Sequence, residues 1–164
     1  MALGQVLDYL NRRKAHYRVV PHRPANTAQE LAAQMHVHGW RLAKPVLLKA
    51  DGRYVLALLP APFVVDFARV RALLGGAEIT LASEEDLRLA FPDSEAGATP
   101  PFGNLYGVPV IVEEKLAAQD SIVFSAGSRR EAIQMGFEEF RQLANPIIAH
   151  FGVPAVPTSM WSQA

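Results

Sequence analysis

Residues 41–60, RLAKPVLLKADGRYVLALLP, place the strongest constraint on the fold, because two apolar runs flank a single Asp-Gly pair. A two-residue hairpin turn needs positive φ angles at both central positions, and Asp-Gly adopts them readily. Residues 41–49 and 53–59 are therefore predicted to form the two antiparallel strands of a β-hairpin. Any fold for this chain must bury these two strands as a pair.

A lysine interrupts the first of these strands. Side chains alternate between the two faces of a strand, which places four of them together: Leu42, Lys44, Val46 and Leu48. Pro45 donates no hydrogen bond to a sheet, which confines it to an edge or to a break beside a cleft. Two interpretations of Lys44 stay open. Its ammonium reaches solvent past the edge, or it holds an anionic or carbonyl-bearing ligand.

Length and composition predict one domain with one core. Half of the 164 residues are hydrophobic, and no stretch reaches the roughly 18 to 20 apolar residues of a membrane span. The 16 basic and 16 acidic residues balance, so a phosphate-binding surface would need a local cluster. One basic run is a candidate for such a cluster or for a solvated helix end: Arg12, Arg13, Lys14, Arg18 and Arg23.

The chain contains no cysteine, which excludes disulfides, thiolate metal sites and a cysteine nucleophile. Nothing in the composition requires an oxidising compartment, and a cytoplasmic protein is the expectation.

Helices and strands are interspersed along the chain, which predicts the α+β class with a mixed sheet. Helices are expected over 1–14, from a Thr27–Glu30 capping box to an end between 36 and 39, from an Asp66 cap to Gly75, over 83–91 and over about 137–144. Strands are expected over 16–22, 41–49, 53–59, 77–82, 108–113, 121–127 and 131–135. Residues 92–107 read as an ordered irregular loop, and the chain from Asn145 reads as a surface-packed or partly mobile tail.

Three histidines raise the question of a metal site. His36 and His38 would share one face of a strand, but they fall at a helix end, where their side chains diverge. No third ligand is evident, so capping or surface roles are expected for them and no metal is predicted. His22, which precedes the helix of residues 28–36, is the better candidate for ligand binding.

Several short segments occur together in an order that resembles a known family. They are His22 and Thr27-Ala28 before a helix, HVHGWRLAKPVLLK over 36–49, GATPPFG over 97–103, and SAGSR over 125–129. This combination is similar to the YbaK/prolyl-tRNA-synthetase-associated domain, a group of aminoacyl-tRNA editing deacylases. The resemblance covers residues 16–145 and leaves 146–164 as a C-terminal tail. It implies a single domain with a mixed, curved β-sheet or incomplete barrel and flanking helices.

The resemblance also implies roles for individual residues. Lys44 matches the lysine that contacts the 3′ end of the charged tRNA, and Gly97 and Pro101 match a loop around the aminoacyl carbonyl. Ser125, Ala126 and Gly127 match a segment that lines the same pocket. Substrate contacts are further expected from His22, Thr27, Phe102 and Gly103. Pro45 departs from the family pattern, in which several members carry a small polar residue, so a side-chain contact there is not expected.

The implied reaction is hydrolysis of an activated ester, which needs a positioned water and a site for the developing oxyanion. The N–H groups of Gly97 and Ala98 are candidates for that site, and Lys44 supplies positive charge. The free ribose hydroxyl would orient the water, so no cofactor, metal or catalytic base is expected. Ser125 and Thr99 have no neighbour that the sequence identifies as a base, so a serine hydrolase triad is unsupported.

The sequence thus predicts a free-standing deacylase that removes a mischarged amino acid in trans, with tRNA(Pro) as the first candidate. Its expected partner is the 3′ end of aminoacyl-tRNA, with an aminoacyl-tRNA synthetase or an elongation factor as further candidates. The alternative from another class is a non-catalytic module that binds an aminoacyl group or a protein in the same cleft.

Overall fold

The computed structural model describes residues 2–25 and 28–155. Its main sheet has five strands in the order β5 (Ile79–Leu81), β2 (Ala43–Ala50), β3 (Arg53–Pro60), β6 (Val110–Glu113) and β9 (Ile147–Ala149). Strands β5, β2 and β3 pair antiparallel, whereas β6 and β9 run parallel to β3. The sheet is therefore mixed, as predicted.

Two smaller sheets complete the strand framework. One contains β1 (Tyr17–Pro21), β8 (Glu131–Gly136) and β7 (Ser121–Ser125), and the other pairs β10 (Gly152–Pro154) with β4 (Phe63–Val65). A single parallel bridge between Leu42 and Val123 joins the three-stranded sheet to the start of β2. The sheets do not close into a barrel, so the predicted α+β class with an incomplete barrel is confirmed.

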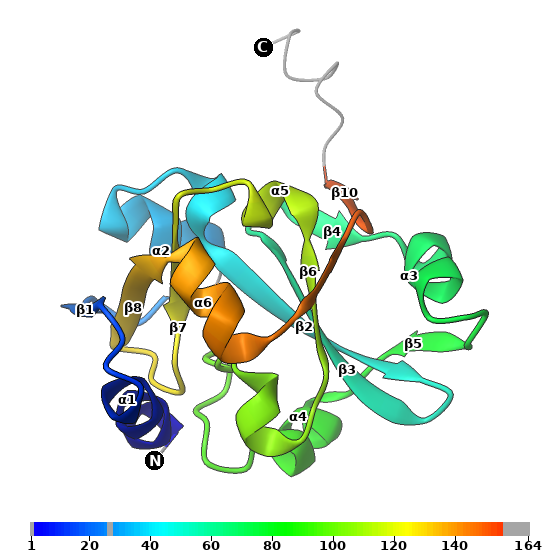
Figure 1. Cartoon of the computed structure of the whole chain (residues 1–164), viewed down its shortest axis with the longest axis horizontal. Coiled ribbons are helices and arrows are strands. Elements are labelled where there is room, and N and C mark those ends of the chain that lie inside the picture. Colours follow the sequence, from blue (N-terminus) through cyan, green and yellow to red (C-terminus); the bar gives the residue numbers. More distant parts are fainter. Residues whose placement is uncertain (1, 26–27, 156–164) are drawn as a thin grey trace, which may run out of the picture.

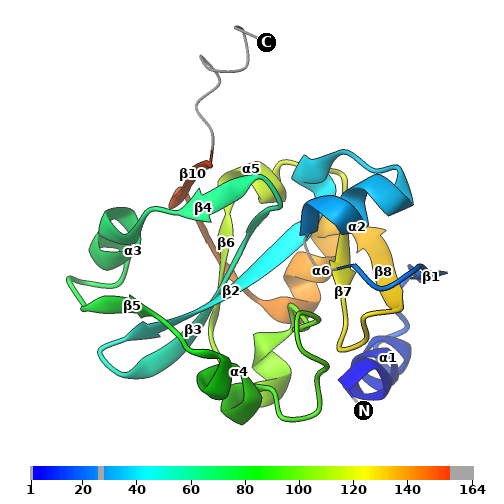
Figure 2. The same ribbon diagram turned by 180° about the vertical axis from the view of Figure 1, so that it is seen from behind.

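Helices lie on both sides of this framework (Figures 1 and 2). The α-helices are α1 (Ala2–Arg12), α2 (Ala28–Met35), α3 (Phe67–Leu73), α4 (Glu84–Ala90), α5 (Glu114–Ala117) and α6 (Phe137–Ala144). Two short 3₁₀ helices are η1 (Gly39–Arg41) and η2 (Gly103–Tyr106). Among residues 2–25 and 28–155, no helix is long and apolar enough to cross a membrane.

The three-stranded sheet is covered on both faces, by α6 on one and by α2 on the other (Figures 1 and 2). Alternation along β7 explains the arrangement, because neighbouring side chains point to opposite faces. Ile122 and Phe124 pack in the same cluster as Phe140 of α6, whereas Val123 packs with Leu31 of α2. The helix α2 is thereby fixed beside the end of β7.

The β2–β3 hairpin is also buried on both faces. Leu47 and Leu58 belong to the largest hydrophobic cluster, and their neighbours Leu48 and Leu59 belong to a second cluster on the opposite face. A strand that is covered on both sides needs no polar face, which explains the nearly continuous apolar run in the sequence.

Local signals in the sequence identified most element boundaries. Asp51 and Gly52 have φ angles of 50° and 81°, as the tight turn requires. The Asp66 carboxylate accepts from two N–H groups at the start of α3, as predicted, and Ser83 and Asp86 form a capping box on α4. Thr27, the predicted cap of α2, lies outside the described residues.

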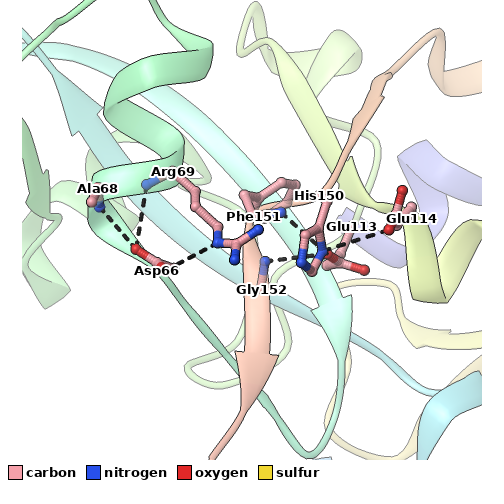
Figure 3. A network of polar contacts seen from close by, with 8 residues as sticks. All are labelled: Asp66, Ala68, Arg69, Glu113, Glu114, His150, Phe151 and Gly152. Carbon is pink, nitrogen blue, oxygen red and sulfur yellow. Dashed lines mark hydrogen bonds and ion pairs between the residues drawn. The ribbon is translucent and has the colours of Figure 1, made fainter.

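The predicted tail begins too early. Residues 147–149 form β9 at the edge of the main sheet, and residues 152–154 pair with β4. A buried carboxylate fixes this segment (Figure 3). The Glu113 Oε1 atom accepts from the N–H groups of Phe151, at 3.1 Å, and Gly152, at 3.2 Å, and lies 2.6 Å from His150 Nδ1. Because a buried carboxylate needs such donors, these contacts hold residues 150–152 against Glu113.

Gly103 provides a test of the packing at η2. A Cβ there would lie 2.5 Å from the Val108 carbonyl oxygen and 2.9 Å from Val110 Cγ2, so alanine cannot fit without a backbone shift. We expect Gly103→Ala to lower the free energy of unfolding by about 1–3 kcal/mol. The control is Gly4→Ala in α1, where a Cβ meets nothing within 4 Å, and this change should raise it by about 0.5–1 kcal/mol. Urea unfolding measures both, and equal stability of wild type and Gly103→Ala would contradict the packing.

Candidate functional site

A cleft of about 460 Å³ opens beside β2, between α2, the β5–α4 connection, the loop of residues 92–102 and the end of β7. This volume suits a small-molecule group or the end of a larger ligand. The lining residues are His22, Ala25, Ala28, Leu31, Leu42, Ala43, Lys44, Pro45, Val46, Leu47, Leu81, Ala82, Leu87, Gly97, Thr99, Ser125 and Arg129. All charged side chains in this lining are basic.

The cleft exists because the edge of β2 is left partly unpaired by β5. Strand β3 pairs with the whole of β2, but β5 pairs only with residues 48–50. The Ala82 N–H donates to the Leu47 carbonyl at 3.0 Å, so alternation turns the Pro45 nitrogen toward the same edge. Proline costs no ladder hydrogen bond there, and its predicted place at an edge beside a cleft is confirmed.

Lys44 is half-buried in the wall of the cleft. Its ammonium donates to the backbone carbonyl of Phe63, and no acidic side chain in the described part of the chain forms an ion pair with it. Desolvation lowers the pKa of Lys44 from its ordinary value of 10.5, because burial disfavours the charged form. One carbonyl leaves two ammonium donors for other groups, so the side chain can receive an anionic or carbonyl oxygen.

The glycine-bearing loop and the end of β7 are held together by backbone hydrogen bonds. The Gly127 N–H donates to the Ala98 carbonyl at 2.7 Å, and the Glu95 N–H donates to the Gly127 carbonyl at 3.0 Å. Gly97 lines the cleft and has a φ angle of 78°, which residues other than glycine rarely adopt. Two segments about 30 positions apart thus form one wall, which also contains Ser125.

The expected oxyanion site needs a correction at Ala98. Its N–H donates to the Glu95 carbonyl at 3.1 Å within the loop, so it is not available to a substrate oxygen in this conformation. The Gly97 N–H has no hydrogen-bond partner among the described residues. Of the two predicted donors, the Gly97 N–H is the one available for a hydrogen bond to a substrate oxygen.

Several residues assigned to the site by resemblance support the cleft from behind. Phe102 is fully buried, and its ring packs against Phe124, with ring centroids 5.6 Å apart, and Phe140, at 5.1 Å. Other such residues that do not line the cleft are Ala98, Pro101, Gly103, Ala126 and Gly127, all of them buried. Thr27 cannot be placed, because it lies outside the described residues.

Four predicted residues do meet at the cleft, namely His22, Lys44, Gly97 and Ser125. Sequence reasoning missed the opposite wall, where Leu81 is 64% exposed and Leu87 stands on α4. An alternating strand pattern cannot reveal that a leucine is exposed, so this signal comes only from the structure. No hydrogen bond joins Ser125 to His22 among the described residues, and a serine hydrolase triad stays unsupported.

Trp40, Tyr106 and His38 lie outside the cleft. The Trp40 ring packs on Phe63, with centroids 5.0 Å apart, and Tyr106 packs on Phe91 at 4.8 Å. Neither of these two aromatic rings lines the cleft, so stacking on a base there is not supported. His38 Nδ1 accepts from the Trp40 N–H at 3.2 Å, which confirms its predicted capping role.

The basic run divides between the two roles considered for it. Arg12 is the last residue of α1, and the Arg13 guanidinium lies 5.5 Å from the centre of the Tyr9 ring, as at a solvated helix end. Arg23 instead follows His22, whose N–H donates to the Arg130 carbonyl. Of Arg23, Arg129 and Arg130, only Arg129 lines the cleft.

Comparisons with known proteins agree with this geometry. The family model of the aminoacyl-tRNA editing domain matches residues 22–143, which include every residue that lines the cleft. No curated protein sequence matches the chain.

Solved structures show the same fold at low identity. A protein described as a "putative trans-editing enzyme for prolyl tRNA synthetase" has a TM-score of 0.82 and 20% identity, over 93% of this chain and 97% of that one. The hypothetical protein APE2540 has a TM-score of 0.83 and 16% identity, over 91% of this chain and 99% of that one. A "putative signal transduction protein" from Marinobacter aquaeolei VT8 has a TM-score of 0.68 and 19% identity, over 90% of this chain and 30% of that one.

The family model spans most of the chain and the whole wall of the cleft. The mixed fold agrees with it, and Lys44 and Gly97 line the same cleft. This protein belongs to the aminoacyl-tRNA editing domain family.

Proposed function

We propose that this protein is a deacylase that hydrolyses the ester of a mischarged aminoacyl-tRNA in trans, with tRNA(Pro) as the first candidate. The observation that carries the proposal is the cleft that Lys44 and Gly97 both line, in which every charged lining residue is basic. Such a site suits the anionic 3′ end of a tRNA. Family membership supports the reaction, and the likeness to a protein described as a prolyl trans-editing enzyme suggests the tRNA.

In this proposal, the ammonium of Lys44 binds the terminal phosphate or the ester and positions the 3′ end. The Gly97 N–H stabilises the oxyanion as water attacks the carbonyl carbon. The free ribose hydroxyl beside the ester orients that water. The ester is already activated, so positioning and charge stabilisation can account for hydrolysis without a cofactor.

The acyl side chain would lie against the apolar part of the cleft. Ala25, Ala28, Leu31 and Leu42 provide that wall, and no charged side chain stands among these four. A hydrophobic wall separates acyl groups that differ by one methylene by only about 10- to 200-fold. Selection would therefore be for small apolar amino acids as a class.

Replacement of Lys44 tests the proposal directly. On a panel of mischarged tRNAs, Lys44→Ala should lower kcat/KM about 100-fold for the substrates that wild type hydrolyses, because a preorganised charge at the reacting ester is lost. Lys49→Ala is the matched control, since Lys49 lies on the same strand but pairs with Asp86 outside the cleft. Release of labelled amino acid measures both.

The same panel separates the alternative function. A binding module would hold a non-hydrolysable aminoacyl-adenosine through the cleft, yet it would not accelerate loss of the ester. If wild type and Lys44→Ala hydrolyse every substrate at one rate while only wild type binds the analogue, the deacylase proposal fails and the binding module stands.

The lowered pKa of Lys44 predicts a specific response to alkaline pH. Activity should fall as the ammonium loses its proton, with a midpoint below the ordinary value of 10.5. Lys44→Arg should move the pH at which activity falls to a higher value, because a guanidinium stays charged. Lys49→Arg should leave that pH unchanged. The measurement is kcat/KM against pH after subtraction of the uncatalysed rate.

Stability should change in the opposite direction over the same range. The pKa of Lys44 is lower in the folded protein than in the unfolded chain, so near pH 10.5 the unfolded chain binds more protons than the folded protein does. The contribution of Lys44 to the free energy of unfolding therefore rises with pH in this range. An activity loss that follows unfolding would therefore contradict the assignment to Lys44.

A further inference from the structure

His22 lines the cleft and has one unsatisfied polar atom in its side chain. Its backbone N–H donates to the Arg130 carbonyl at 2.8 Å, and its Nδ1 lies 2.6 Å from the Arg23 carbonyl oxygen. Its Nε2 is buried and has no hydrogen-bond partner among the described residues. The same side chain lines the cleft with Lys44 and Gly97.

The contact at Nδ1 fixes the chemical character of Nε2. A carbonyl oxygen only accepts hydrogen bonds, so Nδ1 must carry the proton in this contact. In the neutral ring, Nε2 then has a lone pair and acts as an acceptor. A buried acceptor without a donor is costly and uncommon. Because His22 lines the cleft, a ligand bound there could supply that donor.

The charges of the cleft narrow the choice of donor. An aminoacyl-tRNA end carries an α-ammonium and a free ribose hydroxyl as candidate donors beside the ester. Lys44 and Arg129 line the same cleft and disfavour a second cation, whereas a neutral hydroxyl meets no such repulsion. The ribose hydroxyl is therefore the donor that suits both the lone pair of Nε2 and the positive charge of the cleft.

We propose that His22 Nε2 accepts the hydrogen bond of the free hydroxyl on the terminal ribose and is a catalytic residue of the deacylase. This inference rests on the proposed function and assigns a proton acceptor to its hydroxyl-assisted step. The hydroxyl oxygen accepts a proton from the attacking water while the hydroxyl proton moves to Nε2. The water oxygen bonds to the carbonyl carbon, the ester C–O bond breaks, and Nε2 returns the proton to the leaving ribose oxygen.

The test combines changes in the enzyme with changes in the substrate. His22→Ala and His22→Gln are compared with wild type on mischarged tRNA that ends in ordinary adenosine and on tRNA whose free terminal hydroxyl is replaced by hydrogen. On the ordinary substrate, His22→Ala should lower kcat about 100-fold or more with KM changed less than about threefold, as loss of acid–base assistance does. His22→Gln keeps a hydrogen-bond acceptor but no base, so its kcat should lie between those of wild type and His22→Ala.

The deoxy substrate decides the mechanism. If His22 acts through the hydroxyl, wild type should hydrolyse this substrate slowly, and His22→Ala should cause no further loss. Free imidazole should restore His22→Ala on the ordinary substrate alone. His16→Ala is the matched control, because His16 pairs with Glu139 at the surface outside the cleft, and it should match wild type on both substrates.

Each contrary outcome has a distinct meaning. An equal fold-loss of His22→Ala on both substrates, with no rescue by imidazole, overturns the assignment and leaves the proposed function intact. A burst of product with a trapped acyl-enzyme on Ser125 overturns it in favour of a serine nucleophile. Failure of wild type to hydrolyse any ordinary substrate overturns the proposed function and this inference with it.

Discussion

The incomplete pairing of β2 is the constraint on which the rest of the structure depends. Its hairpin with β3 is buried on both faces, so the strand cannot move without exposing two hydrophobic clusters. On its other edge β5 pairs only with residues 48–50, and Pro45 lies where no ladder bond is lost. A rigid strand with an open edge results, and Lys44 stands on that stretch. Binding groups on such an element keep their positions better than groups on a loop.

A second constraint forms the wall of the cleft that contains Gly97 and Ser125. The backbone bonds of Glu95, Ala98 and Gly127 tie the irregular loop to the end of β7. They occupy the Ala98 N–H. The N–H of Gly97, a residue that lines the cleft with a positive φ angle, has no partner among the described residues. Buried residues such as Phe102 pack behind this wall. Some residues that match the family pattern therefore have a structural role.

The electrostatic character of the site follows from these positions. Lys44 is half-buried, and burial lowers its pKa. Its ammonium has the Phe63 carbonyl as its hydrogen-bond partner, and the residue lines the cleft. His22 has one nitrogen turned to a backbone carbonyl and the other without a donor. A cationic residue and a neutral acceptor that line one cleft suit a ligand that carries a phosphate or carbonyl oxygen beside a hydroxyl.

The sequence by itself determined the local structure, because turn and cap signals act within a few residues. Asp51-Gly52 fixed the hairpin, Asp66 and Ser83 fixed two helix starts, and Pro45 marked the open edge. Family resemblance added Lys44, Gly97, Ser125 and His22, which do share the cleft. Three features were decided only by the tertiary structure. The Ala98 N–H forms its hydrogen bond within the loop, and residues 147–154 contribute strands to two of the sheets. Leu81 and Leu87 complete the lining of the cleft. These outcomes depend on contacts between residues far apart in the chain, and periodicity carries no information about such contacts.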